Sequence, residues 1–312
     1  MNKAFNRNGA PGGTRTRDQQ LTRLPLLPLS YRGAIIRIVE RPIYFWLYRL
    51  LRETHFFETL YTPFQKKGGR FVRIDVIMLI SGLDEETLKR RGESLSSYAS
   101  AGTEVKLVLT RHAPPSVESL AEMEMAAPGI LEQVVRSERE GADAVVIWGG
   151  HDPSVKAARE LVSIPVLGPG MASMYIASAL AEKFSLLVQL PQVIGIARRQ
   201  VRDLGLEGRC AAIYSVGLPV LELGKPESFE QVREAAVASV EEGGADAICF
   251  GCMALNDHAA PLTERLAESH PGVVVIHLGK AVIRFTELIV GMGLSHSKRS
   301  YPTPPKDVVF PF

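Results

Sequence analysis

The sequence predicts an α/β fold built from two related halves, each with a parallel sheet covered by helices. Short, almost wholly apolar segments alternate with segments of helical periodicity from Val72 onward. This alternation is typical of parallel sheets, because crossover helices cover both faces of the strands. In addition, the stretch GADAVVIWGG at 141–150 returns as GADAICFGC at 244–252. After each copy comes another apolar stretch ending in glycine, at 164–172 and 273–281, and such self-similarity indicates two halves of similar structure.

The first half begins at Val72 with an apolar segment typical of a buried parallel strand. Its first helix opens with acidic residues at 84–86, where the helix dipole favours negative charge. A loop at 111–119 contains two adjacent prolines and precedes the next helix. Strands are predicted in the segments 72–80, 104–110, 141–150 and 164–172, and helices in 81–102, in 123–139 and after 150.

The second half repeats this rhythm from residue 171 onward. Gly168, Pro169 and Gly170 are predicted to shape the crossover between the halves, and 217–228 is predicted to be a loop. Strands are predicted in the segments 185–190, 210–216, 244–250 and 273–281, and helices in 171–184, 191–206 and 228–243, from about 257, and in 281–293.

Charge is distributed unevenly along the 312 residues. The formal net charge is +2, but residues 1–71 carry 13 Lys and Arg against 4 Asp and Glu, which leaves a net charge of −7 for the remainder. An apolar content of 46% and a charged content of 22% are those of a soluble globular protein. Because the body is acidic and carries no nucleic-acid motif, we expect no nucleic-acid partner.

Residues 1–71 lack the periodicity of the body and are rich in Arg, Pro and Gly. The apolar run 43–51 is interrupted by Arg49, is too short to span a bilayer, and is followed by no small-residue cleavage site. We interpret 1–71 as a disordered or mis-annotated N-terminal extension, with Val72 or Met78 as the true start. A basic amphipathic membrane anchor is the alternative, and we expect no membrane partner.

The three cysteines, Cys210, Cys249 and Cys252, do not make a disulfide framework. Free thiols are typical of a reducing, cytoplasmic location. Cys249 and Cys252 have CxxC spacing, which raises a redox or metal site as an alternative. No second CxxC and no histidine cluster accompanies them, so we interpret Cys249 as a buried structural residue and expect no metal.

The second copy of the repeat places a cysteine where a strand gives way to a helix. The apolar run Ala247–Phe250 ends in Gly251 and Cys252, and a helical pattern starts around Asp257. Backbone N–H groups at a helix start are unpaired and carry partial positive charge, so they can hold a carboxylate and lower the pKa of a thiol. Aligning the copies pairs Gly149 with Cys252, so one half offers a thiol where the other offers only glycine.

Several segments resemble the Asp/Glu/hydantoin racemase superfamily, especially its hydantoin and allantoin racemase branch. They are Asp152-Pro153, Ala157 to Glu160, Gly168 to Ser185, Cys210 to Leu223, Gly251-Cys252, and Ser297-Lys298 with Tyr301. The resemblance runs from about Val72 to Tyr301. It implies two Rossmann-like parallel-sheet domains related by a pseudo-twofold, an active site in the cleft between them, no organic cofactor, and a homo-oligomer.

The expected domains follow from this resemblance. The first α/β domain comprises 72–168 plus 278–300, the second comprises 169–277, and 301–312 forms a tail. The implied substrate is a small carboxylic acid or an amino-acid derivative with an acidic α-carbon.

In the family that the sequence resembles, one cysteine from each half faces opposite sides of the substrate α-carbon, and the two exchange protons with it. The second of these cysteines corresponds to Cys252, whereas the first corresponds to Gly149. A racemase with two bases needs a substitute for the missing thiol. His151 lies two residues on and has an unperturbed pKa suited to proton transfer near neutrality. Alternatively, His151 only caps or lines the loop.

A glycine opposite a single cysteine also resembles the arylmalonate decarboxylase branch. There, the lone cysteine protonates one face of a carbanion left by loss of carbon dioxide. Gly149 and Gly150 would supply unobstructed backbone donors for a retained carboxylate. The hydroxylic residues of that branch are absent, since Gly150 and His151 stand in their place. A third hypothesis is a two-lobed small-ligand binding protein without catalysis.

Further residues are candidates for binding the substrate. Ser81 follows the first strand, although the Asn-Pro-Asn-type loop of the hydantoin racemase branch is absent there. Tyr214 and Ser215 end a strand and either bond a carboxylate or are ordinary strand-end residues. The complete set of binding candidates is Ser81, Gly149, Gly150, Tyr214, Ser215, Gly251 and Met253. Of the other histidines, His258 is expected to face solvent, His277 to approach the site, and His112 to lie in a loop near it.

Overall fold

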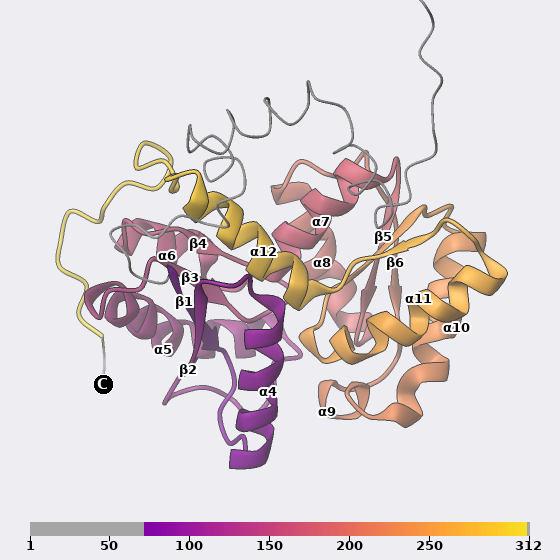
Figure 1. Cartoon of the computed structure of the whole chain (residues 1–312), viewed down its shortest axis with the longest axis horizontal. Coiled ribbons are helices and arrows are strands. Elements are labelled where there is room, and N and C mark those ends of the chain that lie inside the picture. Colours follow the sequence, from indigo (N-terminus) through magenta and orange to yellow (C-terminus); the bar gives the residue numbers. More distant parts are fainter. Residues whose placement is uncertain (1–71, 311–312) are drawn as a thin grey trace, which may run out of the picture. The chain divides into compact units, whose positions relative to one another are not determined.

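Two four-stranded parallel sheets organise residues 72–310, the part of the chain that the computed structural model describes (Figure 1). The predicted extension 1–71 lies outside the described residues, and so does the apolar run considered as a membrane anchor. None of the helices between 72 and 310 combines the length and the apolar character that a membrane crossing requires.

The two sheets have the same strand order, β2-β1-β3-β4 in the first and β6-β5-β7-β8 in the second. The first comprises β1 (Val72–Met78), β2 (Thr103–Leu109), β3 (Ala144–Ile147) and β4 (Val166–Leu167). The second comprises β5 (Phe184–Val188), β6 (Cys210–Ser215), β7 (Ala247–Phe250) and β8 (Val274–Val275). The two copies of the repeat form β3 and β7, which occupy equivalent positions. This arrangement confirms the predicted α/β fold with two similar halves.

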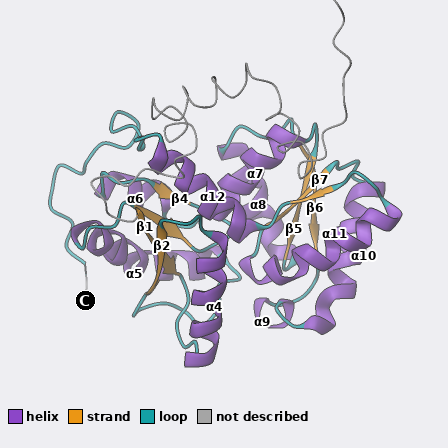
Figure 2. Ribbon diagram, in the orientation of Figure 1, coloured by secondary structure: helices purple, strands orange, loops and turns teal. Residues whose placement is uncertain are grey.

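Helices cover both faces of each sheet (Figure 2). They are α4 (Glu85–Tyr98), α5 (Leu120–Arg139), α6 (Val155–Leu161), α7 (Pro169–Leu180), α8 (Ile194–Asp203), α9 (Val220–Leu223), α10 (Phe229–Glu241), α11 (Ala259–Ser269) and α12 (Leu278–Gly291), with 3₁₀ turns η2 (Pro191–Val193), η3 (Pro226–Ser228) and η4 (Met253–His258). The last helix, α12, packs against α4 and β3 of the first half and against α7 of the second.

Burial on both faces explains why the central strands β3 and β7 are apolar throughout. In β3, Val145 and Ile147 belong to the core cluster under α5 and α6, whereas the intervening Val146 belongs to the cluster under α4 and α12. Cys249 in β7 is likewise fully buried in the cluster formed with α7 and α8, and burial raises the pKa of its thiol. Successive side chains point to opposite faces of a strand, so an apolar residue is needed at every position.

Several predicted elements differ in type or bounds from the structure, among them the strands expected at 164–172 and 273–281, which are only Val166–Leu167 and Val274–Val275. The predicted loop 217–228 contains the short helix α9 and a 3₁₀ turn. The helix expected from about Asp257 begins at Ala259, because η4 first occupies Met253–His258. The helix expected from 171 begins at Pro169, whose ring is well accommodated in the first turn, where no N–H is required.

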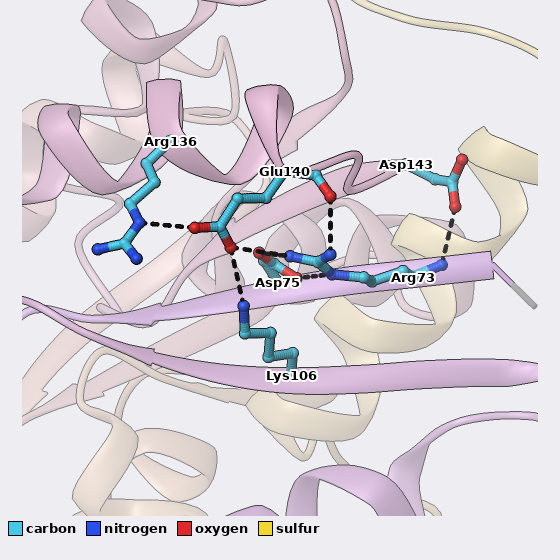
Figure 3. A network of polar contacts seen from close by, with 6 residues as sticks. All are labelled: Arg73, Asp75, Lys106, Arg136, Glu140 and Asp143. Carbon is cyan, nitrogen blue, oxygen red and sulfur yellow. Dashed lines mark hydrogen bonds and ion pairs between the residues drawn. The ribbon is translucent and has the colours of Figure 1, made fainter.

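A network of charged residues lies toward the amino-terminal ends of the strands of the first sheet (Figure 3). The fully buried Asp75 accepts two hydrogen bonds of 2.8 Å from the guanidinium of Arg73. Arg73 also donates to the backbone carbonyl of Glu140, and the carboxylate of Glu140 accepts from Lys106 and Arg136. The network therefore combines one buried pair with exposed pairs around it.

Replacement of Asp75 by Ala is expected to lower the free energy of unfolding by about 3 kcal/mol, because it strips a mostly buried guanidinium of its bidentate partner. Arg136→Ala is the control, since it removes an exposed partner of the same network and should cost under about 0.5 kcal/mol. Urea unfolding of both variants measures the difference. Equal losses would contradict the assignment of Asp75 as the central residue.

Candidate active site between the two sheets

A cavity of about 570 Å³ lies where the carboxyl ends of β1, β3, β5 and β7 converge. Residues immediately after all four strands line it, so both halves contribute. In open parallel sheets, ligands bind beyond the carboxyl ends of the strands, because the loops there are free to vary. Of the predicted site residues, this cavity brings together Gly149, Gly150, His151, Gly251, Cys252 and Met253.

The two equivalent turns of the repeat meet backbone to backbone beside the cavity. A Cβ atom on Gly150 would overlap the carbonyl oxygen of Gly251 and lie 2.9 Å from the amide nitrogen of Cys252. A Cβ atom on Gly149 would lie 2.5 Å from Cδ2 of Leu79 and 2.8 Å from a ring carbon of Pro153. Glycine at position 150 therefore lets the turns approach closely, and glycine at position 149 lets Leu79 and Pro153 pack against the backbone.

Cys252 is buried, with 8% of its surface exposed. Burial raises the pKa of its thiol to about 11, and the backbone N–H of Ala254 and the charge of Arg91 only partly oppose this shift. The expected lowering of this pKa is therefore wrong in direction. A 3₁₀ turn follows Cys252 instead of an α-helix, and loss of hydration outweighs the backbone donor. Without ligand, Cys252 is a protonated thiol at neutral pH.

His151 extends from the turn after β3 toward the turn that carries the cysteine. Its Cε1 would lie 3.2 Å from a Cβ atom placed on Gly251. Its Nδ1 lies 3.3 Å from Oε1 of Gln200, while Nε2 is buried without a hydrogen-bond partner among residues 72–310. Burial lowers the pKa of His151 to about 4, so the ring is neutral at pH 7.

Gln200, on α8, decides which nitrogen of His151 carries the proton. Its amide nitrogen donates to the carbonyl of Gly150 (3.1 Å) and to the carboxylate of Asp152 (2.9 Å). These two bonds turn its oxygen toward His151, so Nδ1 of His151 donates and Nε2 keeps a free lone pair. A residue of the second half thus fixes the tautomer of a histidine in the first.

Asp152 ties the same turn to α7. It adopts a left-handed conformation (φ 54°), and its carboxylate accepts hydrogen bonds from the amides of Gly170 (2.8 Å) and Met171 (2.7 Å). These amides belong to the first turn of α7, whose unpaired N–H groups favour a negative charge. Burial raises the pKa of Asp152 to about 6, although the hydrogen bonds oppose this. The bonds explain how a non-glycine residue is held at positive φ.

Sequence reasoning missed Gln189, which follows β5. Its side chain is 2% exposed, lines the cavity, and has an Oε1 without a hydrogen-bond partner in the described part of the chain. Its backbone carbonyl accepts from the amides of Gly217 and Leu218. A single polar residue at the end of an apolar strand was the available signal. The cavity therefore contains residues with two buried acceptors, on His151 and Gln189, that a ligand could satisfy.

Three predicted binding residues do not line the cavity. Ser81 donates to the carbonyl of Ala113 (2.6 Å) and fixes the loop 111–119, although its neighbours do line the cavity. Tyr214 and Ser215 end the edge strand β6, so β5 separates them from β7 and its cysteine turn. The Tyr214 hydroxyl lies 3.5 Å from Glu242, and Ser215 donates to the carbonyl of Gln189. The interpretation of these two as ordinary strand-end residues fits their positions.

The histidines beyond the repeat also differ from expectation. His258 was expected to face solvent but is 4% exposed, with Nε2 2.7 Å from the carbonyl of Leu223 and 2.9 Å from Oγ of Ser228. It is buried because the segment containing α9 folds over it. His277 caps α12 and packs edge-on against Tyr98, with ring centroids 4.9 Å apart, and it does not line the cavity. His112 does not line it either.

The donor atoms needed for a metal centre do not gather in the described part of the chain. Within residues 72–310, no three His, Cys, Asp or Glu side chains lie close enough together to hold a metal ion. The thiol of Cys249 lies 3.7 Å from the carbonyl of Ser173 in the core, on the face of the second sheet that packs against α7 and α8.

Several known proteins similar to this chain are racemases. A family model described as Asp/Glu/Hydantoin racemase matches residues 86–286. A hydantoin racemase from Pseudomonas sp. (strain NS671) is 35% identical over 215 residues, which cover 67% of this chain and 84% of that protein.

Two solved structures share the fold over most of their length. The allantoin racemase from Klebsiella pneumoniae is 34% identical with a TM-score of 0.70, and the match covers 76% of this chain and 96% of that one. The allantoin racemase from Pseudomonas fluorescens is 28% identical with a TM-score of 0.69, covering 76% of this chain and 99% of that one. The arrangement of two related sheets around a cleft is therefore shared.

Replacement of Gly150 by Ala is expected to lower the free energy of unfolding by about 1–3 kcal/mol, because the new methyl group meets backbone atoms that cannot rotate away. Gly92→Ala is the matched control. It lies within α4 with open space around the position of a Cβ atom, so it should be neutral or stabilise by up to about 1 kcal/mol. Thermal or urea unfolding compares the two, and a neutral Gly150→Ala would refute the close contact of the turns.

Proposed function

The chain belongs to the Asp/Glu/hydantoin racemase family, and from this premise we propose that it is a cofactor-independent racemase or epimerase. In this proposal, it inverts the α-carbon of a small carboxylic acid or amino-acid derivative. Cys252 and His151 are the two acid/base groups on opposite faces of that carbon. The observation that carries the proposal is that a thiol and an unpartnered ring nitrogen, from equivalent turns of the two halves, belong to residues lining one cavity.

The protonation states of the two groups suit one direction of such a reaction. His151 is neutral, and its free Nε2 can accept the α-proton from one face of the substrate. Cys252 is a thiol and can deliver a proton to the other face. After inversion, the pair is left as an imidazolium and a thiolate, which is the state needed to convert the opposite enantiomer. Each turnover therefore exchanges the protonation states of Cys252 and His151.

The turns also supply donors for the charge that develops on the substrate. The amide N–H groups of Gly150, His151 and Cys252 form no hydrogen bond with residues 72–310. Such fixed donors at the edge of a largely apolar cavity can stabilise an enolate oxygen without reorganisation. Because the α-C–H beside a carbonyl is a weak acid, this stabilisation is required for proton transfer at a useful rate.

The substrate class follows in part from Gln189. Its unpartnered oxygen can accept an N–H from an amide, imide or ureide next to the reacting carbon. The similar proteins named hydantoin racemase and allantoin racemase suggest a ring of this kind. We therefore extend the proposal to cyclic derivatives of amino acids that carry a ring N–H.

Single enantiomers of 5-substituted hydantoins, incubated in deuterium oxide, test this proposal. The wild-type protein should replace the α-proton by deuterium and lose optical purity. Cys252→Ala should lower racemisation at least about 1,000-fold yet retain slow exchange for the enantiomer whose proton faces His151. His151→Ala should lose racemisation as well. Cys210→Ala, outside the cavity, is the control and should keep wild-type activity.

Other outcomes would rule out the proposed chemistry or favour another function. Intact racemisation by Cys252→Ala would rule out the proposed chemistry. If the protein releases carbon dioxide from a disubstituted malonate, forms a single product enantiomer, and keeps this activity in His151→Ala, a single-cysteine decarboxylase is favoured. This function is the second candidate because Gly149 pairs with Cys252 in the repeat. Tight binding without turnover would favour a binding protein.

The pH dependence of kcat/KM should show an unusually broad plateau. The base form of His151 is lost only as pH falls through about 4, and the acid form of Cys252 is lost only as pH rises through about 11. Activity should therefore be nearly constant between pH 7 and 9, within about twofold, whereas below pH 7 protonation of Asp152, whose pKa burial raises to about 6, also affects the site. Tryptophan fluorescence at each pH controls for unfolding. A loss of activity within the range from pH 7 to 9 would contradict the pKa values that burial gives His151 and Cys252.

A further inference from the structure

Arg91 differs from the other charged residues that line the cavity. It lies on α4, and its guanidinium forms neither a hydrogen bond nor an ion pair with any residue from 72 to 310, although the residue is only partly exposed. A guanidinium offers five N–H donors, and partial burial without partners is unfavourable. A ligand that supplies acceptors would remove this penalty.

The face of α4 toward the cavity is polar. Thr87, Arg91, Ser94 and Tyr98 all line the cavity and follow one another at helical spacing. This stripe would usually be expected to face solvent in an amphipathic helix, but here it forms one wall of the site. Arg91 is therefore held on a rigid element, which suits specific recognition.

The remaining charges of the cavity do not neutralise Arg91. Lys225 is paired with Glu222 at 2.7 Å, and Asp84 is occupied as the N-cap of α4 through Thr87. Arg90 is exposed and adds positive charge. Asp257 is also exposed and acts on Arg91 electrostatically without forming an ion pair. The charge of Arg91 also acts on the Cys252 thiol, so the guanidinium and the cysteine belong to the same site.

We propose that Arg91 binds a carboxylate substituent of the substrate, separate from the group that acidifies the reacting carbon. This inference rests on the proposed function for the position of the reacting carbon. The planar fork of a guanidinium matches a carboxylate in two parallel hydrogen bonds. A cavity of about 570 Å³ accommodates a small ring between the turns and an acidic arm reaching α4.

The substrate class is therefore a derivative of an acidic amino acid. In such a compound, the α-carbon lies between Cys252 and His151, the ring N–H meets Gln189, and the side-chain carboxylate meets Arg91. A charge-assisted bidentate contact of this kind contributes roughly 10- to 100-fold in selectivity over a neutral group of the same shape.

Hydantoin-5-acetic acid and its neutral amide, hydantoin-5-acetamide, form a matched pair of probes that differ in charge but hardly in shape. Exchange of the C5 proton in deuterium oxide gives kcat/KM for each. The wild-type protein should prefer the acid by about 10- to 100-fold. Arg91→Met should bring the ratio of kcat/KM for the acid to kcat/KM for the amide close to 1. Arg91→Lys should retain part of the preference.

Lys89→Met is the matched control, since it removes the same charge from an exposed position of the same helix that does not line the cavity. It should keep the wild-type ratio. Equal use of acid and amide by the wild type, or a preference that survives Arg91→Met, would overturn the assignment of Arg91 while leaving the proposed racemase intact.

Calorimetric titration of the same probes separates the two proposals. If neither probe is turned over but the acid binds at least tenfold more tightly than the amide, and Arg91→Met abolishes this difference, Arg91 is supported and the racemase function fails. If neither probe binds at all, the assignment of Arg91 fails.

Discussion

The contact between two backbone turns governs the rest of the site. Gly150 and Gly251 lie in the turns that follow the equivalent strands β3 and β7, and their backbones touch without side chains between them. Any Cβ atom on Gly150 would separate the turns, which would open the cavity to water and move His151 away from the cysteine turn. The electrostatic properties of both acid/base candidates depend on this contact, because it is burial that sets their pKa values.

The sequence predicted this architecture well because its strongest signal was structural. A repeated strand and turn can only be buried in equivalent positions of two similar sheets, and β3 and β7 occupy those positions. The carboxyl ends of parallel strands lie at one edge, so placing Gly149 and Cys252 at a common cleft required no knowledge of side-chain contacts. Strand order was not needed for that inference.

Strand order was needed for the residues that sequence reasoning misplaced. Tyr214 and Ser215 end a strand, as Gln189 does, but β6 is an edge strand and β5 is central, and the sequence does not distinguish them. Burial of His258 depends on the α9 segment, which was expected to be a loop. The direction of the Cys252 pKa depends on burial in the core cluster of the second half, where distant segments such as β5 and α9 pack together, and local sequence does not show this packing.

The proposed pairing of Cys252 with His151 has a consequence for how the substrate must act. Without substrate, moving a proton from a Cys252 thiol of pKa about 11 to a His151 ring of pKa about 4 costs on the order of 10 kcal/mol. Turnover at ordinary rates allows a barrier of roughly 13–17 kcal/mol, so this ionisation would consume most of it. A bound substrate must therefore bring the two pKa values together. An anionic carbon intermediate stabilises the imidazolium on one side, and the backbone N–H of Ala254 stabilises the thiolate on the other. On this argument, burial keeps both groups neutral at rest, and the substrate itself supplies the field that makes them exchange a proton.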